Sequence, residues 1–149
     1  DADKDRIKLD DKLAEKHKDL NFILPMHPNP AVTEHKDLLE HVKVIDPVPY
    51  DEFIKMLAAC KFAITDSGGL QEELSFFGKL CIVCRKKTER TEGLGTFAFL
   101  CMKPDNLEEL FSRVNDNYSS VKDIPSPYGD GKSAKKILKL IKDGYVTGI

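Results

Sequence analysis

The chain has 149 residues, of which 41% are apolar and 32% are charged, with a formal net charge of −2. This length suits one domain with a substantial core, and the near-neutral charge gives no sign of the basic face that nucleic-acid-binding proteins present. No apolar run approaches the ~20 residues that span a bilayer, and residues 1–11 are too polar for a secretory signal. Composition therefore predicts a cytoplasmic protein whose partners include neither nucleic acid nor a membrane.

Short apolar runs alternate with amphipathic segments along the chain. Strands are expected at residues 21–26, 42–45, 62–65, 80–84 and 97–101. Helices are expected at residues 7–20, 30–40, 50–58, 70–77, 105–114 and 132–142. The second of these helices should begin at Pro30 with Asn29 as its cap, and the fourth should stop at Gly78. Helical spacing predicts two apolar faces, one made of Tyr50, Phe53, Ile54, Leu57 and Ala58 and the other of Ala134, Ile137, Leu138 and Ile141.

Strands that alternate with helices predict βαβ units, and hence an α/β fold with a parallel sheet covered by helices on both faces. Such sheets bind ligands in the crevice beyond the carboxyl ends of their strands. The loops at His27, Asp46, Asp66 and Arg85 each follow a predicted strand. We therefore expect these loops to line one common edge of the sheet.

The four cysteines lie in apolar stretches and lack the dense spacing of a secreted disulfide scaffold. Cys81 and Cys84 form a C-x-x-C pattern within a predicted strand. The other two cysteines are Cys60 and Cys101. Side chains three apart on a strand point to opposite faces, so one ion cannot easily bind both. The sequence favours buried, reduced thiols over a metal or redox site.

The segment from Thr65 to Glu73 carries the sharpest motif, because a strand runs through small residues into a helix. A helix N-terminus offers unpaired N–H groups and a partial positive charge, and glycines let an anion approach the backbone. Ser67, Gly68 and Gly69 could therefore hold a phosphate, with the Ser67 hydroxyl as a further donor. The simpler alternative is a helix cap in a tight turn.

Three further features accompany this turn. Glu72 and Glu73 either stabilise the helix dipole or supply one carboxylate to the hydroxyls of a ribose. Residues 85–90 are basic and should face Ser67, which suits phosphate binding, although a solvated charged loop would have the same composition. His27 follows a strand beside two prolines, which makes it a candidate at the same edge.

Six segments, in their order along the chain, together resemble the non-hydrolysing UDP-N-acetylglucosamine 2-epimerases. No single segment is specific, but the ordered set is, and the similarity extends from about residue 20 to the end. The segments are His27-Pro-Asn-Pro30, Asp46-Pro47 with Tyr50 and Phe53, Thr65-Asp-Ser-Gly-Gly-Leu-Gln-Glu-Glu73, Gly78-Lys79, Thr88-Glu-Arg90 with Glu92, and Pro127-Tyr-Gly-Asp-Gly131.

This resemblance implies the Rossmann-like C-terminal half of a GT-B two-domain fold, with residues 1–20 as a helical lead-in and residues 21–149 as the UDP-binding domain. By resemblance, Ser67, Gly68 and Gly69 hold the diphosphate and Glu73 holds the ribose. The resemblance also implies that the Phe53 segment contacts the uracil, largely through its backbone. Arg90 and His27 would face the phosphate or the sugar.

The implied reaction interconverts UDP-N-acetylglucosamine and UDP-N-acetylmannosamine by elimination and re-addition of UDP, without cofactor or metal. The family's catalytic carboxylates lie in an N-terminal domain that we expect this chain to lack, so His27 is the one catalytic candidate here. That domain, in the same or another chain, is an expected partner, and a homodimer is compatible with the resemblance. The alternatives are half of a GT-B glycosyltransferase and a non-catalytic UDP-binding module.

Overall fold

The computed structural model describes residues 2–26 and 33–144. His27, and the predicted helix start at Asn29 and Pro30, lie outside the described residues. The helices are α1 (Ala2–Lys16), α3 (Tyr50–Ala59), α4 (Gly68–Phe76), α5 (Leu107–Asn117) and α6 (Ser133–Lys142), with 3₁₀ turns η1 (Lys36–Leu38) and η2 (Pro104–Asn106). The strands are β1 (Ile23–Pro25), β2 (Lys43–Ile45), β3 (Ala63–Thr65), β4 (Cys81–Val83) and β5 (Ala98–Leu100).

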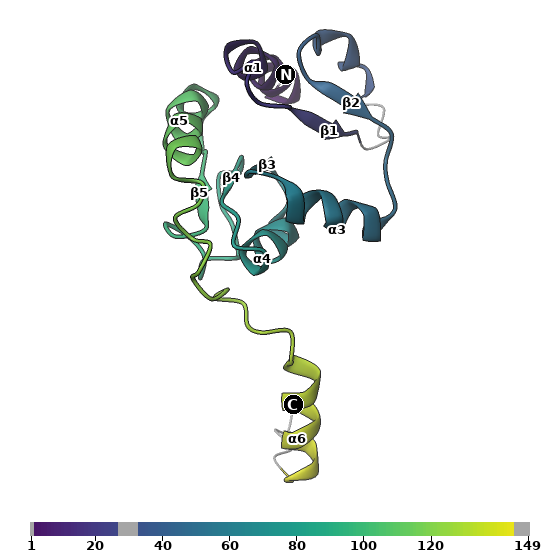
Figure 1. Cartoon of the computed structure of the whole chain (residues 1–149), viewed down its shortest axis with the longest axis vertical. Coiled ribbons are helices and arrows are strands. Elements are labelled where there is room, and N and C mark those ends of the chain that lie inside the picture. Colours follow the sequence, from purple (N-terminus) through teal and green to yellow (C-terminus); the bar gives the residue numbers. More distant parts are fainter. Residues whose placement is uncertain (1, 27–32, 145–149) are drawn as a thin grey trace.

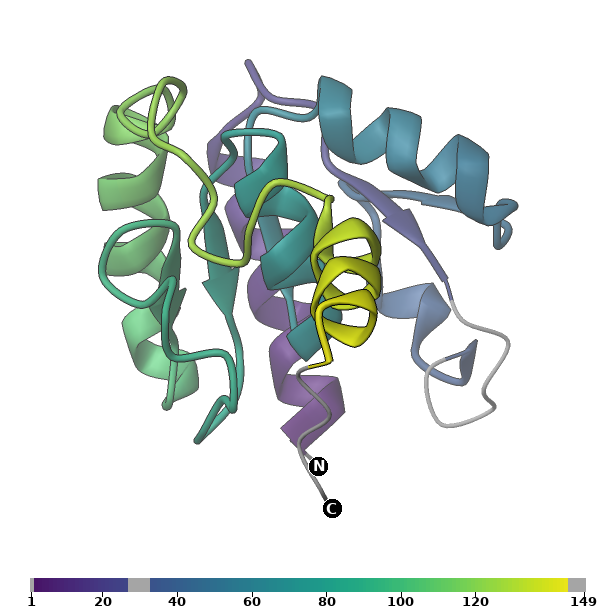
Figure 2. The ribbon, with the colours of Figure 1, turned by 90° about the horizontal axis from the view of Figure 1, so that it is seen from below.

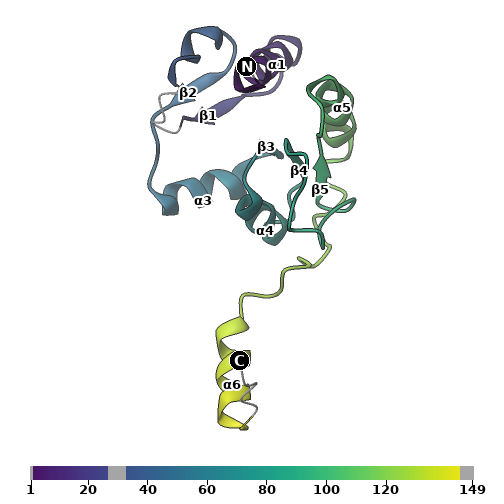
Figure 3. The ribbon, with the colours of Figure 1, turned by 180° about the vertical axis from the view of Figure 1, so that it is seen from behind.

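All strand pairs among the described residues are parallel, as the βαβ pattern predicts. Hydrogen bonds join β1 to β2, and separately join β3, β4 and β5 in that order. Figure 1 shows β1 and β2 beside α1, and β3 to β5 between α5 and the pair α3 and α4. The same arrangement is seen from behind in Figure 3. The predicted parallel strand arrangement is therefore confirmed, but the hydrogen bonds form two separate sheets, one of two strands and one of three.

Helices pack on both faces of the sheet, and β4 shows why. Its Ile82 side chain belongs to an apolar cluster that includes Leu13 of α1 and Phe111 of α5. Its flanking residues Cys81 and Val83 belong to a second cluster, with Leu57 of α3 and Leu74 of α4. Because all three β4 residues are fully buried, alternation along this strand predicts one covered face for each cluster.

The C-x-x-C pair is divided between the same two clusters, as the strand geometry predicts. Cys81 lies in the cluster of α3 and α4, whereas Cys84 packs against the cluster of α1 and α5. Both are free thiols. Burial raises the pKa of each to about 12, so both stay protonated and unreactive near neutral pH.

Two local predictions are wrong. From Glu34 to Glu40 the chain contains the single 3₁₀ turn η1 rather than a helix ending near Glu40. Ala58 is exposed and Tyr50 is 66% exposed, so neither joins the predicted apolar face. Tyr50 is the first residue of α3, and its hydroxyl donates a hydrogen bond to Glu73 of α4, so it faces a neighbouring helix rather than the core.

Asp11 of α1 binds the backbone of the three residues that precede β2. Its Oδ1 accepts hydrogen bonds from the backbone N–H groups of Glu40, His41 and Val42 at 2.9, 2.7 and 3.2 Å. Its Oδ2 lies 2.9 Å from the His41 Nδ1. Burial opposes ionisation of Asp11, but these bonds outweigh it and lower its pKa. The hydrogen bond that His41 donates to the Asp11 carboxylate raises the pKa of His41 above its usual 6.5.

These shifts predict a pH-dependent stability. The His41 contribution is fully present below pH 6.5, the pKa expected in the unfolded chain, and is lost as pH rises through the raised folded pKa. His41→Gln should therefore lower the urea midpoint at pH 5.5 more than at pH 8.5. An equal loss at both pH values would show that charge on His41 does not contribute.

Helix α6 stands away from the rest of the molecule, joined by an extended segment (Figure 1), and in the view from below it lies in front of the body (Figure 2). Its residues Ile137, Leu138 and Ile141 form the predicted apolar side, yet they are 57, 52 and 59% exposed. Leu140 is 51% exposed as well. In the described part of the chain, no helix combines the length and the apolar character needed to cross a membrane.

Candidate functional site

The Ser67-Gly68-Gly69 turn connects β3 to α4 and lies open at its two outer residues. Ser67 and Gly69 are exposed, and the Ser67 side chain makes no capping hydrogen bond to α4. The backbone N–H of Ser67 donates instead to Thr65 Oγ1 at 3.0 Å. Since the first N–H groups of any helix lack intrahelical partners, this turn presents both a free hydroxyl and helix-end donors. Ser67 is the N-cap residue of α4, as the simpler alternative expects, but its side chain does not bond to the helix.

The basic loop faces this turn, as the sheet topology predicts. A Cβ added to Gly68 would lie 3.3 Å from Arg85 Nη1 and 3.5 Å from Arg90 Nη1. The same position would be only 2.7 Å from Glu89 Oε1. Two guanidinium groups and the start of α4 therefore converge on one place, where positive charge and N–H donors favour an anion.

Buried hydrogen bonds fix the backbone of this loop. Gln71 of α4 is 1% exposed, and its Nε2 donates to Thr88 Oγ1 at 2.8 Å. Thr88 Oγ1 also accepts from the Arg90 N–H at 3.1 Å. The Tyr128 hydroxyl donates to Arg90 O and accepts from Gly93 N, both at 3.2 Å. Sequence reasoning missed Gln71 and gave Tyr128 no role of its own. The helical spacing of Gln71 with Gly68 and Leu74, three residues to either side, was the signal that its side chain faces inward.

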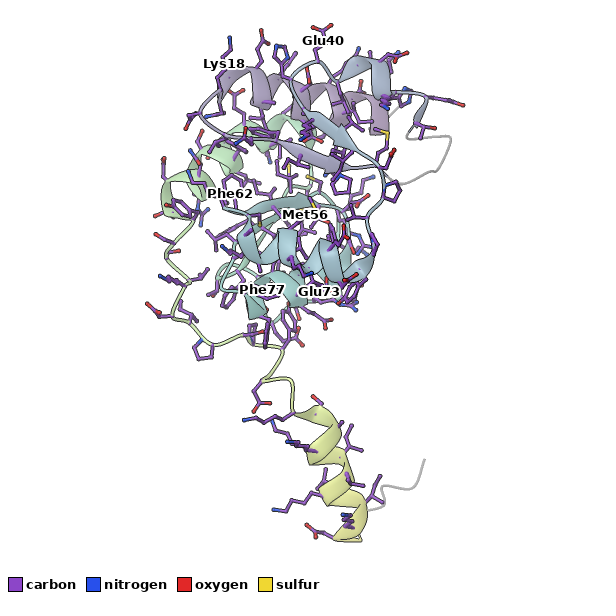
Figure 4. All side chains as sticks on the ribbon, turned by 45° about the vertical axis from the view of Figure 1, so that its right-hand side comes forward. Lys18, Glu40, Met56, Phe62, Glu73 and Phe77 are labelled. Atoms are coloured by element: carbon purple, nitrogen blue, oxygen red, sulfur yellow. The ribbon has the colours of Figure 1, made fainter. Side chains whose placement is uncertain are left out.

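The acidic pair on α4 divides between two partners. Glu72 Oε1 accepts a hydrogen bond from Arg90 Nε at 2.8 Å, which raises the pKa of Arg90. Glu73 Oε1 accepts from the Tyr50 hydroxyl at 2.6 Å, which raises the pKa of Tyr50. In Figure 4, Glu73 lies directly beneath α3, the helix that begins with Tyr50. Glu72 thus positions an arginine, while Glu73 keeps a second carboxylate oxygen for a ligand.

The remaining candidates are less directly placed. The Phe53 side chain is partly buried and packs against the cluster that contains Leu57 and Leu74. His27 lies outside the described residues. Among those described, no group of three or more His, Cys, Asp or Glu side chains is arranged to hold a metal ion.

Comparison with known proteins identifies one family. The family model described as UDP-N-acetylglucosamine 2-epimerase matches residues 3–142. The chain is 33% identical over 144 residues to the UDP-N-acetylglucosamine 2-epimerase of Escherichia coli K12, covering 91% of this chain and 38% of the relative. It is 34% identical over 138 residues to the Bacillus subtilis enzyme of that name, covering 85% and 36%.

Solved structures agree with this match. A UDP-GlcNAc 2-epimerase from Neisseria meningitidis bound to UDP-GlcNAc superposes with a TM-score of 0.78 at 32% identity, over 93% of this chain and 41% of that one. A co-structure of S. aureus MnaA with UDP gives a TM-score of 0.85 at 28% identity, over 96% and 41%. The chain thus spans about two fifths of the length of the proteins it matches.

Proposed function

Since this chain belongs to the UDP-N-acetylglucosamine 2-epimerase family, we propose that it is the UDP-binding part of an enzyme that interconverts UDP-N-acetylglucosamine and UDP-N-acetylmannosamine. The observation that carries the proposal is the convergence of Arg85 and Arg90 on the open start of α4. The names of the relatives favour this isomerase over the glycosyltransferase alternative.

In this proposal the diphosphate binds where Ser67, Gly68 and Gly69 open into α4. The exposed hydroxyl and the helix-end N–H groups donate to its oxygens, and Arg90 balances its charge. His27, which follows β1 in the sequence, is a further candidate for contact with the phosphate or sugar. Because UDP leaves and returns during the reaction, these donors would also stabilise the negative charge that develops on the leaving diphosphate.

The ribose would lie between the start of α3 and the side of α4 that carries Glu73. Its two hydroxyls donate to Glu73, which Tyr50 holds in place through one carboxylate oxygen. The uracil would then continue toward the backbone of the Phe53 segment. Four free thiols also suit a reducing compartment, so we place the enzyme in the cytoplasm.

Glu73→Ala tests the ribose assignment. It should weaken UDP binding about 10-fold or more, because charge-assisted hydrogen bonds to both ribose hydroxyls are lost. Amide shifts of residues 67–73 during a UDP titration measure the Kd, and the rise in melting temperature with UDP measures it independently. Glu109→Ala, an exposed carboxylate of α5, is the matched control. Wild-type affinity in Glu73→Ala would remove Glu73 from the site.

The amphipathic helix α6 provides an attachment point for the catalytic part of the enzyme. We propose that its exposed face of Ile137, Leu138 and Ile141 packs on the N-terminal catalytic domain. The matched structures contain about three fifths of a chain beyond the portion superposed here, and an isolated helix of 10 residues is marginal in water.

Hydrogen exchange tests the role of α6. In this chain alone, amides of residues 133–142 should exchange nearly as fast as in an unfolded peptide, because α6 stands away from the other described helices and strands. Adding the separate N-terminal domain of a 2-epimerase from this family should slow the exchange of these amides. The substitution Leu138→Glu should prevent this slowing. Lys135→Glu, which alters charge without touching the apolar face, should not. Protection in the chain alone would show that α6 packs elsewhere.

A further inference from the structure

The carboxylate of Glu89 already lies where the proposed function needs an anion. Its Oε2 is 3.5 Å from Arg85 Nη1, and its Oε1 accepts a hydrogen bond from Arg90 Nη1. That same Oε1 is the atom nearest to a Cβ placed on Gly68, the first residue of α4. A hydrogen bond to its own backbone and both guanidinium groups lower the pKa of Glu89, so it is ionised at neutral pH.

A diphosphate and this carboxylate require the same surroundings. Both are anions that seek guanidinium groups and a helix start, and like charges at such a short separation repel. We propose that Glu89 is a resident anion of the nucleotide site, and that the diphosphate of a UDP-sugar binds by displacing its carboxylate from Arg85 and Arg90. This inference rests on the proposed function.

The local geometry allows this exchange by a side-chain movement alone. Glu89 is 57% exposed, so its carboxylate can swing into water, and an exposed ion pair is weak. Arg90 does not depend on Glu89 for its position, because Glu72 holds its Nε and Thr88 holds its N–H. Loss of the Glu89 charge should therefore remove a competitor of the diphosphate without disordering Arg90.

Glu89→Gln tests the exchange. Its Kd for UDP should fall about fivefold relative to wild type, while its Kd for uridine, which lacks phosphate, should not change. Glu92→Gln removes an exposed carboxylate from the same loop and should leave both constants at wild-type values. A melting curve superposable on that of wild type would confirm that Glu89→Gln folds normally.

The outcomes separate this inference from the proposed function. Wild-type chain that binds UDP, together with a Glu89→Gln variant that binds it equally or less well, would overturn the resident anion alone. A gain of similar size for uridine, or in Glu92→Gln, would also overturn it, because the effect would not concern the diphosphate at this position. Failure of both wild type and Glu89→Gln to bind millimolar UDP would overturn the proposed function itself.

Discussion

Arg90→Ala should weaken UDP binding about 10- to 100-fold, because a hydrogen-bonded charge at the diphosphate is removed. Arg90 links two parts of the proposed site. Its Nε donates a hydrogen bond to Glu72, and its Nη1 lies close to Gly68. Calorimetry or amide shifts give the Kd of the variant. Lys87→Ala is the matched control, because Lys87 is an exposed cation of the same loop.

Arg90→Lys distinguishes geometry from charge at this position. A lysine keeps the positive charge but has one ammonium group, which cannot bind Glu72 and the diphosphate through separate nitrogens as a guanidinium can. We expect it to recover only part of the affinity lost in Arg90→Ala. Equal loss in Arg90→Ala and Lys87→Ala would show that only general electrostatic attraction acts here, and would contradict the assignment of Arg90.

The approach of Arg90 to Gly68 was predictable because it depends on topology alone. Parallel strands direct the loops after β3 and β4 to one edge, whatever the side chains are. The position of Glu89 was not predictable in this way. Residues 85–90 have the composition of a basic segment, and only the structure shows its one carboxylate lying against the helix start.

Contacts between distant segments were missed for a related reason. The pairs Gln71 with Thr88, and Tyr50 with Glu73, join residues 17 and 23 positions apart. Hydrophobic periodicity reports which way a side chain faces but not which polar partner it meets. It placed Tyr50 on an apolar face, and only its bond to Glu73 shows why this aromatic side chain stays exposed.

Phe111→Ala should destabilise the fold by about 3–5 kcal/mol, through lost apolar burial and the cavity left behind. Phe111 is 1% exposed. Its ring contacts those of His17, Phe22 and Phe62, with centroids 4.7, 5.6 and 5.2 Å away. The cavity would therefore open where α5 meets the segment after α1 and the segment before β3.

Urea denaturation at constant pH measures this loss, and Phe76→Ala is its control, because Phe76 is 62% exposed and should cost less than about 1 kcal/mol. A typical domain has only about 5–15 kcal/mol of stability, so Phe111→Ala would remove a large part of it. The proposed nucleotide site lies on the side of α3 and α4, whereas Phe111 belongs to the cluster on the other face of the sheet. UDP should accordingly bind folded Phe111→Ala with wild-type affinity, and a matching loss of affinity would show that the two faces of the sheet are energetically coupled.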